Sequence, residues 1–288
     1  MRCAVLAATT AILAPLLAGC MHAAPLPPKA IALNRDGAAA MAAGDLETAE
    51  ARIALALEYN ARFTEAWVNL GLIEMMRGNF VGARRDFVRA RDLNPDLPAP
   101  HHALGLLAER ELAGIEAERD YRAALKVDPG FAPARINLAR RLFERGALEE
   151  AREQFLRATQ VTPDVVDGWA GLAETLLRLD RPDEASEALT LARARFGEHP
   201  TLVLLEARFL LRRRAFAEAE SRLLPLCRSS DASRASAALA WLAIARLGRG
   251  DVDGADDSAR QALALDSEDH VARYALDAVG RAIRTDRP

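Results

Sequence analysis

The chain has few of three kinds of residue on which many protein classes depend. Its 288 residues include three cysteines, Cys3, Cys20 and Cys227, which are too few and too scattered for a disulfide framework or a four-ligand zinc site. Lysine occurs only at Lys29 and Lys126, so a phosphate-binding loop that ends in Gly-Lys is excluded. Aromatic residues make up 5% of the chain, which is low for a β-rich core.

The charges and motifs do not indicate an enzyme, a metalloprotein or a nucleic-acid-binding protein. The 38 Lys and Arg residues nearly balance the 41 Asp and Glu residues, giving a net charge of −3, whereas nonspecific nucleic-acid binding needs a basic surplus. No His-Glu-x-x-His or Gly-x-Ser-x-Gly motif is present. The neighbouring His101 and His102 would point about 100° apart on a helix, which does not suit one metal ion. We therefore expect no catalytic residues, metal, cofactor or small-molecule substrate.

The first residues are typical of a secretory signal peptide. Arg2 precedes residues 3–18, which are apolar apart from Thr9 and Thr10. This run is shorter than the roughly 20 residues that span a membrane, and Pro15 interrupts a helix there. Such a segment is removed from the mature protein and takes no part in the fold.

The residues that follow indicate a lipid anchor. Leu17-Ala18-Gly19-Cys20 resembles the lipobox of bacterial lipoproteins. The resemblance implies cleavage of residues 1–19 and attachment of acyl chains such as palmitate to Cys20, and two or more chains anchor stably. In such lipoproteins an Asp after the cysteine retains the protein in the inner membrane. Here that residue is Met21, so the resemblance also implies that the protein lies at the periplasmic face of the outer membrane. The alternative is an ordinary signal peptide with a chance cysteine. Residues 20–29, rich in proline, are expected to form an extended tether.

A period of 34 residues fills the rest of the chain. The frames are 30–63, 64–97, 98–131, 132–165, 166–199, 200–233 and 236–269. Position twenty of every frame is alanine: Ala49, Ala83, Ala117, Ala151, Ala185, Ala219 and Ala255. Position eight is always Gly or Ala, and position twenty-four is aromatic or aliphatic in the first six frames. Such a period indicates an array of stacked supersecondary units, because no single unit can bury its apolar face alone.

These columns resemble the tetratricopeptide repeat. The second frame carries nearly the whole pattern: Trp67, Leu70, Gly71, Ala83, Phe87, Ala90 and Pro95. The resemblance implies an all-α, right-handed α-solenoid of about seven helix-turn-helix repeats, with residues 270–288 forming a capping helix and tail. The sixth frame departs most, because Glu206 replaces the leucine of position seven and Leu226 replaces an alanine. The register is therefore less secure after about residue 200.

The resemblance also implies where a partner binds. In this family the first helix of each repeat lines a concave groove that holds a polypeptide. The expected groove residues are Val68, Asn69, Leu72, Met75, Met76, His102, Leu106, Ile136, Asn137, Arg140, Phe143, Glu174 and Leu177. The two asparagines occupy a family position that often bonds a peptide backbone. We expect about a third of the set to pack between helices instead.

The lipobox, short tether and repeats together resemble the pilotin and pilus-assembly lipoproteins of type IV and Flp (tight-adherence) pili. That resemblance implies a protein-binding scaffold in the outer membrane that helps a secretin or pilus complex to assemble. One alternative is an adaptor for another envelope machine, such as polysaccharide export or cell-wall synthesis. An enzyme with a site hidden in the groove and self-association through an open end of the stack are two others.

Overall fold

The computed structural model describes residues 25–285 and is built from α-helices, with no strand among those residues. Each repeat is a pair of antiparallel helices. The pairs are α1 (Pro28–Ala42) and α2 (Leu46–Tyr59), α3 (Thr64–Met76) and α4 (Phe80–Leu93), α5 (Pro98–Arg110) and α6 (Gly114–Val127), α7 (Ala132–Glu144) and α8 (Leu148–Val161), α9 (Val166–Arg178) and α10 (Pro182–Phe196), α11 (Pro200–Arg212) and α12 (Phe216–Leu223), and α13 (Ala232–Gly248) and α14 (Val252–Leu265). Helix α15 (His270–Thr285) follows and packs on α13 and α14.

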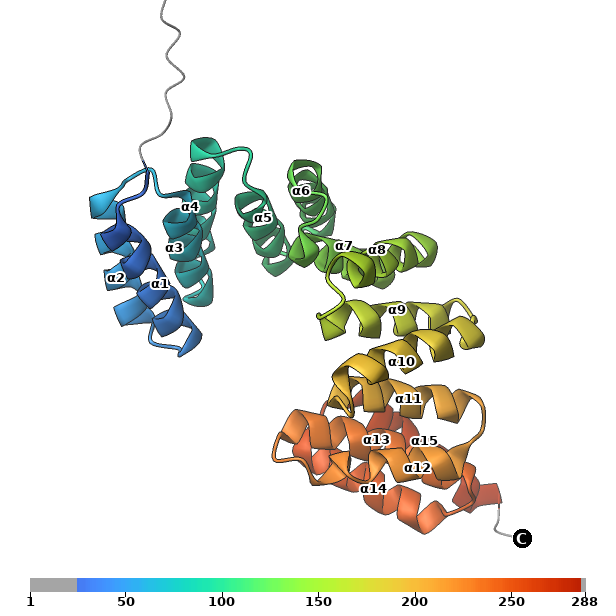
Figure 1. The fold of residues 1–288 in the computed structure, drawn as a ribbon. Helices are drawn as coiled ribbons and strands as arrows, with labels where there is room; N and C mark the ends of the chain where they lie inside the picture. The colour runs from blue at the N-terminus through green and yellow to red at the C-terminus, as the bar shows by residue number, and fades with distance from the viewer. Residues whose placement is uncertain (1–24, 286–288) are drawn as a thin grey trace, which may run out of the picture.

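The pairs stack side by side in chain order to form a curved solenoid, with α1 near one end and α14 and α15 at the other (Figure 1). The first helices of neighbouring repeats, such as α7 and α9 or α9 and α11, lie next to each other. The prediction of an all-α tetratricopeptide solenoid is therefore confirmed.

Small residues allow the two helices of a repeat to approach closely. All seven alanines at position twenty are fully buried. At position eight, a methyl group on Gly71 would lie 2.5 Å from the ring of Phe87, and one on Gly105 would lie 2.5 Å from Tyr121. The large side chain at position twenty-four thus fills the space left by the glycine of its own repeat.

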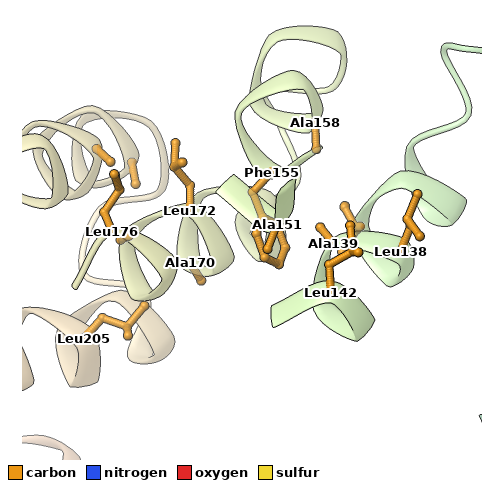
Figure 2. Close-up of a cluster of buried hydrophobic side chains, with 14 of the residues drawn as sticks. Leu138, Ala139, Leu142, Ala151, Phe155, Ala158, Ala170, Leu172, Leu176 and Leu205 are labelled. Carbon is orange, nitrogen blue, oxygen red and sulfur yellow. The ribbon is translucent and has the colours of Figure 1, made fainter. Parts of the chain in front are cut away.

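The fourth repeat solves the same packing problem differently. Its position eight is Ala139, which leaves less room, and the ring of Phe155 packs instead against Gly171 of the next repeat. Figure 2 shows this ring between the helix of Ala139 and the helix of Ala170. The interface between repeats four and five is therefore filled by an aromatic ring from the earlier repeat.

The turn inside each repeat needs a left-handed backbone. Position fifteen has positive φ in all seven repeats, and four of these residues are the predicted glycines Gly44, Gly78, Gly146 and Gly250. The other three are Leu112, Asp180 and Arg214, at φ of 58° to 60°. A non-glycine residue in this region is strained, so these three turns are less favourable in free energy than the turns with glycine.

The loops between repeats are secured by the residue at position four of the next helix. The indole nitrogen of Trp67 donates to the carbonyl oxygen of Ala61 at 2.9 Å, and that of Trp169 donates to Pro163 at 2.9 Å. In the fourth repeat, Arg135 makes the equivalent bond over the same six-residue spacing. Different donor types thus fulfil one structural role, which the sequence columns do not reveal.

Two boundaries differ from the predicted ones. Helix α1 begins at Pro28, inside the expected tether, because proline is well suited to the first turn of a helix. Helix α13 begins at Ala232 and not at Ser236, since the side chain of Asp231 accepts a hydrogen bond from the backbone of Arg234 and caps the helix early. The predicted signal peptide and lipidated Cys20 lie outside the described residues.

Candidate functional site

The first helices of repeats four to seven line an open cavity of about 590 Å³. Its lining comes mainly from positions two, five, six and nine of α7, α9, α11 and α13, the same columns that predicted the groove. A second cavity of about 410 Å³ shares four of these residues and extends to the start of α15. The shared residues are Glu174, Arg208, Ala237 and Trp241. We call the two cavities together the C-terminal groove.

A row of charges crosses this groove. Position nine is Arg140 in α7, Glu174 in α9 and Arg208 in α11. Arg208 and Glu174 form an ion pair at 2.8 Å, and the guanidinium of Arg208 lies 5.3 Å from the ring centre of Trp241. This places a fixed, partly neutralised charge over an aromatic surface.

Arg140 differs from its neighbours in this row. Its side chain is exposed, and it forms no ion pair or hydrogen bond with any residue between 25 and 285. The adjacent Arg141 is already paired with Glu144 at 2.5 Å. The α7 end of the groove therefore offers an exposed guanidinium without a direct ion pair, beside the partly buried ring of Phe143, and guanidinium groups bind carboxylates strongly.

The predicted groove residues differ in where the structure places them. Four of them line the cavity: Ile136, Arg140, Phe143 and Glu174. Three that were expected to face a partner are buried between helices: Val68, Ile136 and Leu177. Ile136 belongs to both groups, since its small exposed part reaches the cavity. Val68 and Leu177 therefore offer little surface to a partner and belong to the third of the set that was expected to pack between helices.

The N-terminal half of the predicted groove presents mainly apolar side chains. Leu72 and Met75 are half-buried against the cluster formed by α3, α4 and α5, and Leu106 is half-buried against the larger central core. Met76 is 54% exposed. A partner that extended toward α3 would therefore find apolar contact area there, chiefly on Met76.

The two asparagines bond the preceding repeat. Asn69 Nδ2 donates to Asn34 Oδ1 at 2.9 Å, and Asn137 Nδ2 lies 2.9 Å from His102 Nε2. Burial lowers the pKa of His102 to about 4, so the imidazole is neutral at pH 7 and can accept from Asn137. These amide hydrogens hold repeats together, in contrast to the expected bond with a peptide backbone.

The sequence analysis missed the part of the groove that lies beyond repeat five. Thr201, Leu204, Arg208 and Trp241 occupy positions two, five, nine and six of the sixth and seventh frames. The signal was present in the same columns, but the weaker register after residue 200 kept these positions out of the predicted set.

Glu206, which replaces the leucine of position seven in the sixth repeat, has a structural explanation. Its side chain is only 14% exposed and lies 3.3 Å from Arg222, in the wall of a cavity of about 600 Å³ between α10 and α12. Burial raises the pKa of Glu206. Helix α12 has only eight residues, so this repeat leaves a gap where a leucine would otherwise meet a longer second helix.

Other site types receive no support from the described residues. No group of His, Cys, Asp and Glu in residues 25–285 is arranged to hold a metal ion. Over the same range, no helix is both long and apolar enough to cross a bilayer. Cys227 donates to the carbonyl of Leu223 at 3.3 Å, and burial raises the pKa of its thiol, as befits a small packed side chain.

Fold and groove together define a class: an all-α solenoid of two-helix repeats with an open, charged concave surface. Models of the tetratricopeptide repeat match residues 114–173 in one case and residues 17–98 and 171–231 in another. The chain therefore belongs to the tetratricopeptide repeat family.

The chain is similar in sequence to two proteins of known role. The chain is 27% identical over 157 residues to the type IV pilus assembly protein PilF of Pseudomonas aeruginosa, an alignment that covers 54% of the chain and 62% of PilF. It is also 27% identical over 148 residues to the protein O-mannosyl-transferase TMTC3 of Mus musculus, covering 46% of the chain but 16% of that protein. The chain thus spans less than two thirds of the length of either relative.

Solved structures share the fold. The structure of Pseudomonas aeruginosa PilF matches with a TM-score of 0.60 at 23% identity, covering 73% of this chain and 95% of that one. The structure of PilW, described as a widely conserved type IV pilus biogenesis factor, matches with a TM-score of 0.56 at 16% identity, covering 87% and 99%. The predicted resemblance to pilus-assembly repeat proteins is confirmed.

Proposed function

We propose that this chain is a non-catalytic, lipid-anchored scaffold that holds a partner polypeptide in its concave groove on the periplasmic face of the outer membrane. The partner is a component of a pilus machine, with the secretin as the first candidate. The observation that carries the proposal is the groove itself, an open cavity of about 590 Å³ lined by the first helices of four successive repeats.

Three further features support it. A concave site with apolar walls and a few fixed polar groups is the usual form of a binding site. The sequence similarity to PilF points toward pilus assembly, since that relative is named for this role. Leu17-Ala18-Gly19-Cys20 supplies the signal for a lipid anchor.

The test is photo-crosslinking in cells from Thr201, which lines the cavity on α11 and is exposed, so it can be replaced without opening the core. We expect a crosslink to one envelope protein, identified by mass spectrometry as a secretin or pilus component. The matched control is the same photoreactive residue at Arg52, which is exposed on α2. Equal capture from both positions, or capture of polysaccharide-export or cell-wall enzymes, would contradict the proposal.

A second arm tests the anchor. Cys20→Ser should move the protein from the membrane fraction to the soluble periplasm and abolish labelling by radioactive palmitate, because the modified thiol is lost. Unchanged membrane attachment of Cys20→Ser would rule out the lipobox interpretation while leaving the groove untouched.

A further inference from the structure

The C-terminal groove has opposite electrostatic character at its two ends. At the α7 end, Arg140 makes no direct ion pair within residues 25–285, and its charge interacts with the half-buried Glu109. The guanidinium of Arg178 lies 5.0 Å from the ring centre of Phe143 without an ion pair to any described carboxylate. The carboxylate of Glu144 is neutralised by Arg141. This end therefore attracts anions.

The other end of the groove is acidic. The cavity between α11, α13 and α15 is lined by Asp266, Glu268 and Asp269, and the one basic lining residue besides Arg208 is His270. Arg208 is already paired with Glu174, and Glu268 is paired with Arg273 outside the lining. Asp269 caps the N-terminus of α15 and accepts from Ser236, so its charge is partly offset. Asp266, exposed at the C-terminus of α14, therefore carries most of the negative charge where the groove ends.

Between the two ends, the charges of Glu174 and Arg208 pair with each other, and the remaining surface is mainly apolar. Leu204 of α11 and Trp241 of α13 line it, with Ala237 leaving room beside them. Asp167 is the remaining charge in this cavity, and it lies in the first turn of α9, where the partial positive charge of the helix N-terminus offsets a carboxylate. The lining thus changes from basic through apolar to acidic along the row of helices.

The dimensions of the groove favour an extended occupant. Three steps from α7 to α13, at about 8–10 Å per pair of packed helices, span about 24–30 Å. An extended chain at about 3.3 Å per residue crosses this distance in about seven to nine residues. A helix, at about 1.5 Å per residue, would need about 16–20 residues to cover the same span, so an extended chain is the shortest segment that reaches both ends of the groove.

We propose that the C-terminal groove selects an extended partner segment of about nine residues that carries an acidic side chain at one end, a large apolar side chain in the middle and a basic side chain at the other end. The acidic group bonds Arg140, the apolar group lies on Leu204 and Trp241, and the basic group faces Asp266 and Asp269. This inference rests on the proposed function, because it specifies the chemistry of the polypeptide that the groove holds.

The experiment is selection of a random nine-residue peptide library, displayed on phage, against the purified full chain in detergent. Wild type and the control variant Arg52→Glu should enrich the acidic–apolar–basic pattern, in one chain direction. Arg140→Glu should lose the acidic preference and bind the wild-type consensus peptide about tenfold or more weakly, as expected for removal of a charge-assisted hydrogen bond. Asp266→Asn, at an exposed side chain of the acidic end, should weaken the basic preference.

The outcomes separate the two proposals. A consensus with the same charges for wild type and Arg140→Glu would overturn the charge pattern, while peptide binding itself would still support the groove. A wild-type chain that enriches no peptide would overturn the pattern and the proposed function together. Reversal to a basic preference at the α7 end in Arg140→Glu would support the assignment most directly.

Discussion

The close contact between Gly71 and Phe87 makes a sharp prediction about packing inside a repeat. A Cβ atom on Gly71 would lie 2.5 Å from the ring, about 1 Å closer than carbon atoms normally approach. Phe87 is fully buried, so its ring has little room to move. Overpacking of this kind costs about 2–3 kcal/mol, and the better helix propensity of alanine returns about 1 kcal/mol. Gly71→Ala should therefore lower the free energy of unfolding by about 1–2 kcal/mol.

The matched control is Gly168→Ala in α9, where the new methyl group would meet its nearest neighbour at an ordinary 3.5 Å. This variant should be more stable by about 0.5–1 kcal/mol, because only the backbone effect remains. Adding Phe87→Leu to Gly71→Ala should restore part of the loss, since the fifth repeat pairs Ala173 with Leu189 in the same two columns.

Urea unfolding monitored together with hydrogen exchange of the α3–α4 peptides measures these effects. Exchange is needed because repeat arrays need not unfold in one step. The expected signature is faster exchange in α3 and α4 of Gly71→Ala, with the distant repeats unchanged. A Gly71→Ala protein as stable as wild type would show that position eight does not set the distance between the helices.

Two further predictions concern the neighbouring α5–α6 region. The pKa of His102 is about 4 in the folded chain and about 6.5 in the unfolded chain, so between these pH values only the unfolded chain binds a proton there. As the pH falls through that interval, the free energy of unfolding should therefore decrease by at most about 3 kcal/mol. His102→Gln should remove this loss when denaturation is measured as a function of pH. A free energy of unfolding that depends on pH as steeply as in wild type would contradict the prediction. The raised pKa of Glu109 changes stability in the opposite direction and is present in both proteins. Leu112 is 92% exposed and has a φ of 60°, so Leu112→Gly should relieve about 0.5–1 kcal/mol of backbone strain and raise the melting temperature. Gly78→Leu places a side chain on a residue with the same kind of backbone and should lower the melting temperature. Equal shifts in the same direction for these two variants would refute the argument from backbone strain.

The sequence was sufficient to predict the fold because its signal is repeated. A single alanine means little, but alanine at position twenty of all seven frames reflects one packing requirement met seven times, and each of these residues is fully buried. The same columns placed Arg140 and Glu174 on the concave side, where the structure has them. Periodicity thus predicts which face a residue occupies.

Periodicity does not predict how deep a residue lies on its face. Val68 and Ile136 share position five, yet only Ile136 reaches a cavity, because the local spacing of first helices decides what remains exposed. The ring of Phe155 shows the same limit, since it packs on Gly171 of the next repeat when its own glycine is replaced by alanine. Such choices depend on several side chains at once and are not visible in one column.

The hydrogen bonds of Asn69 to Asn34 and of Asn137 to His102 give the array a step of two repeats. Each joins position six of one repeat to position five of the repeat before it, and the intervening pair is Ala103 with Val68. Removing residues 98–131 would set Asn137 against Val68, whereas removing residues 64–131 would set it against Asn34 and keep a polar match. Shortening or lengthening within the first four repeats should therefore be tolerated best in steps of sixty-eight residues, about twice the apparent period.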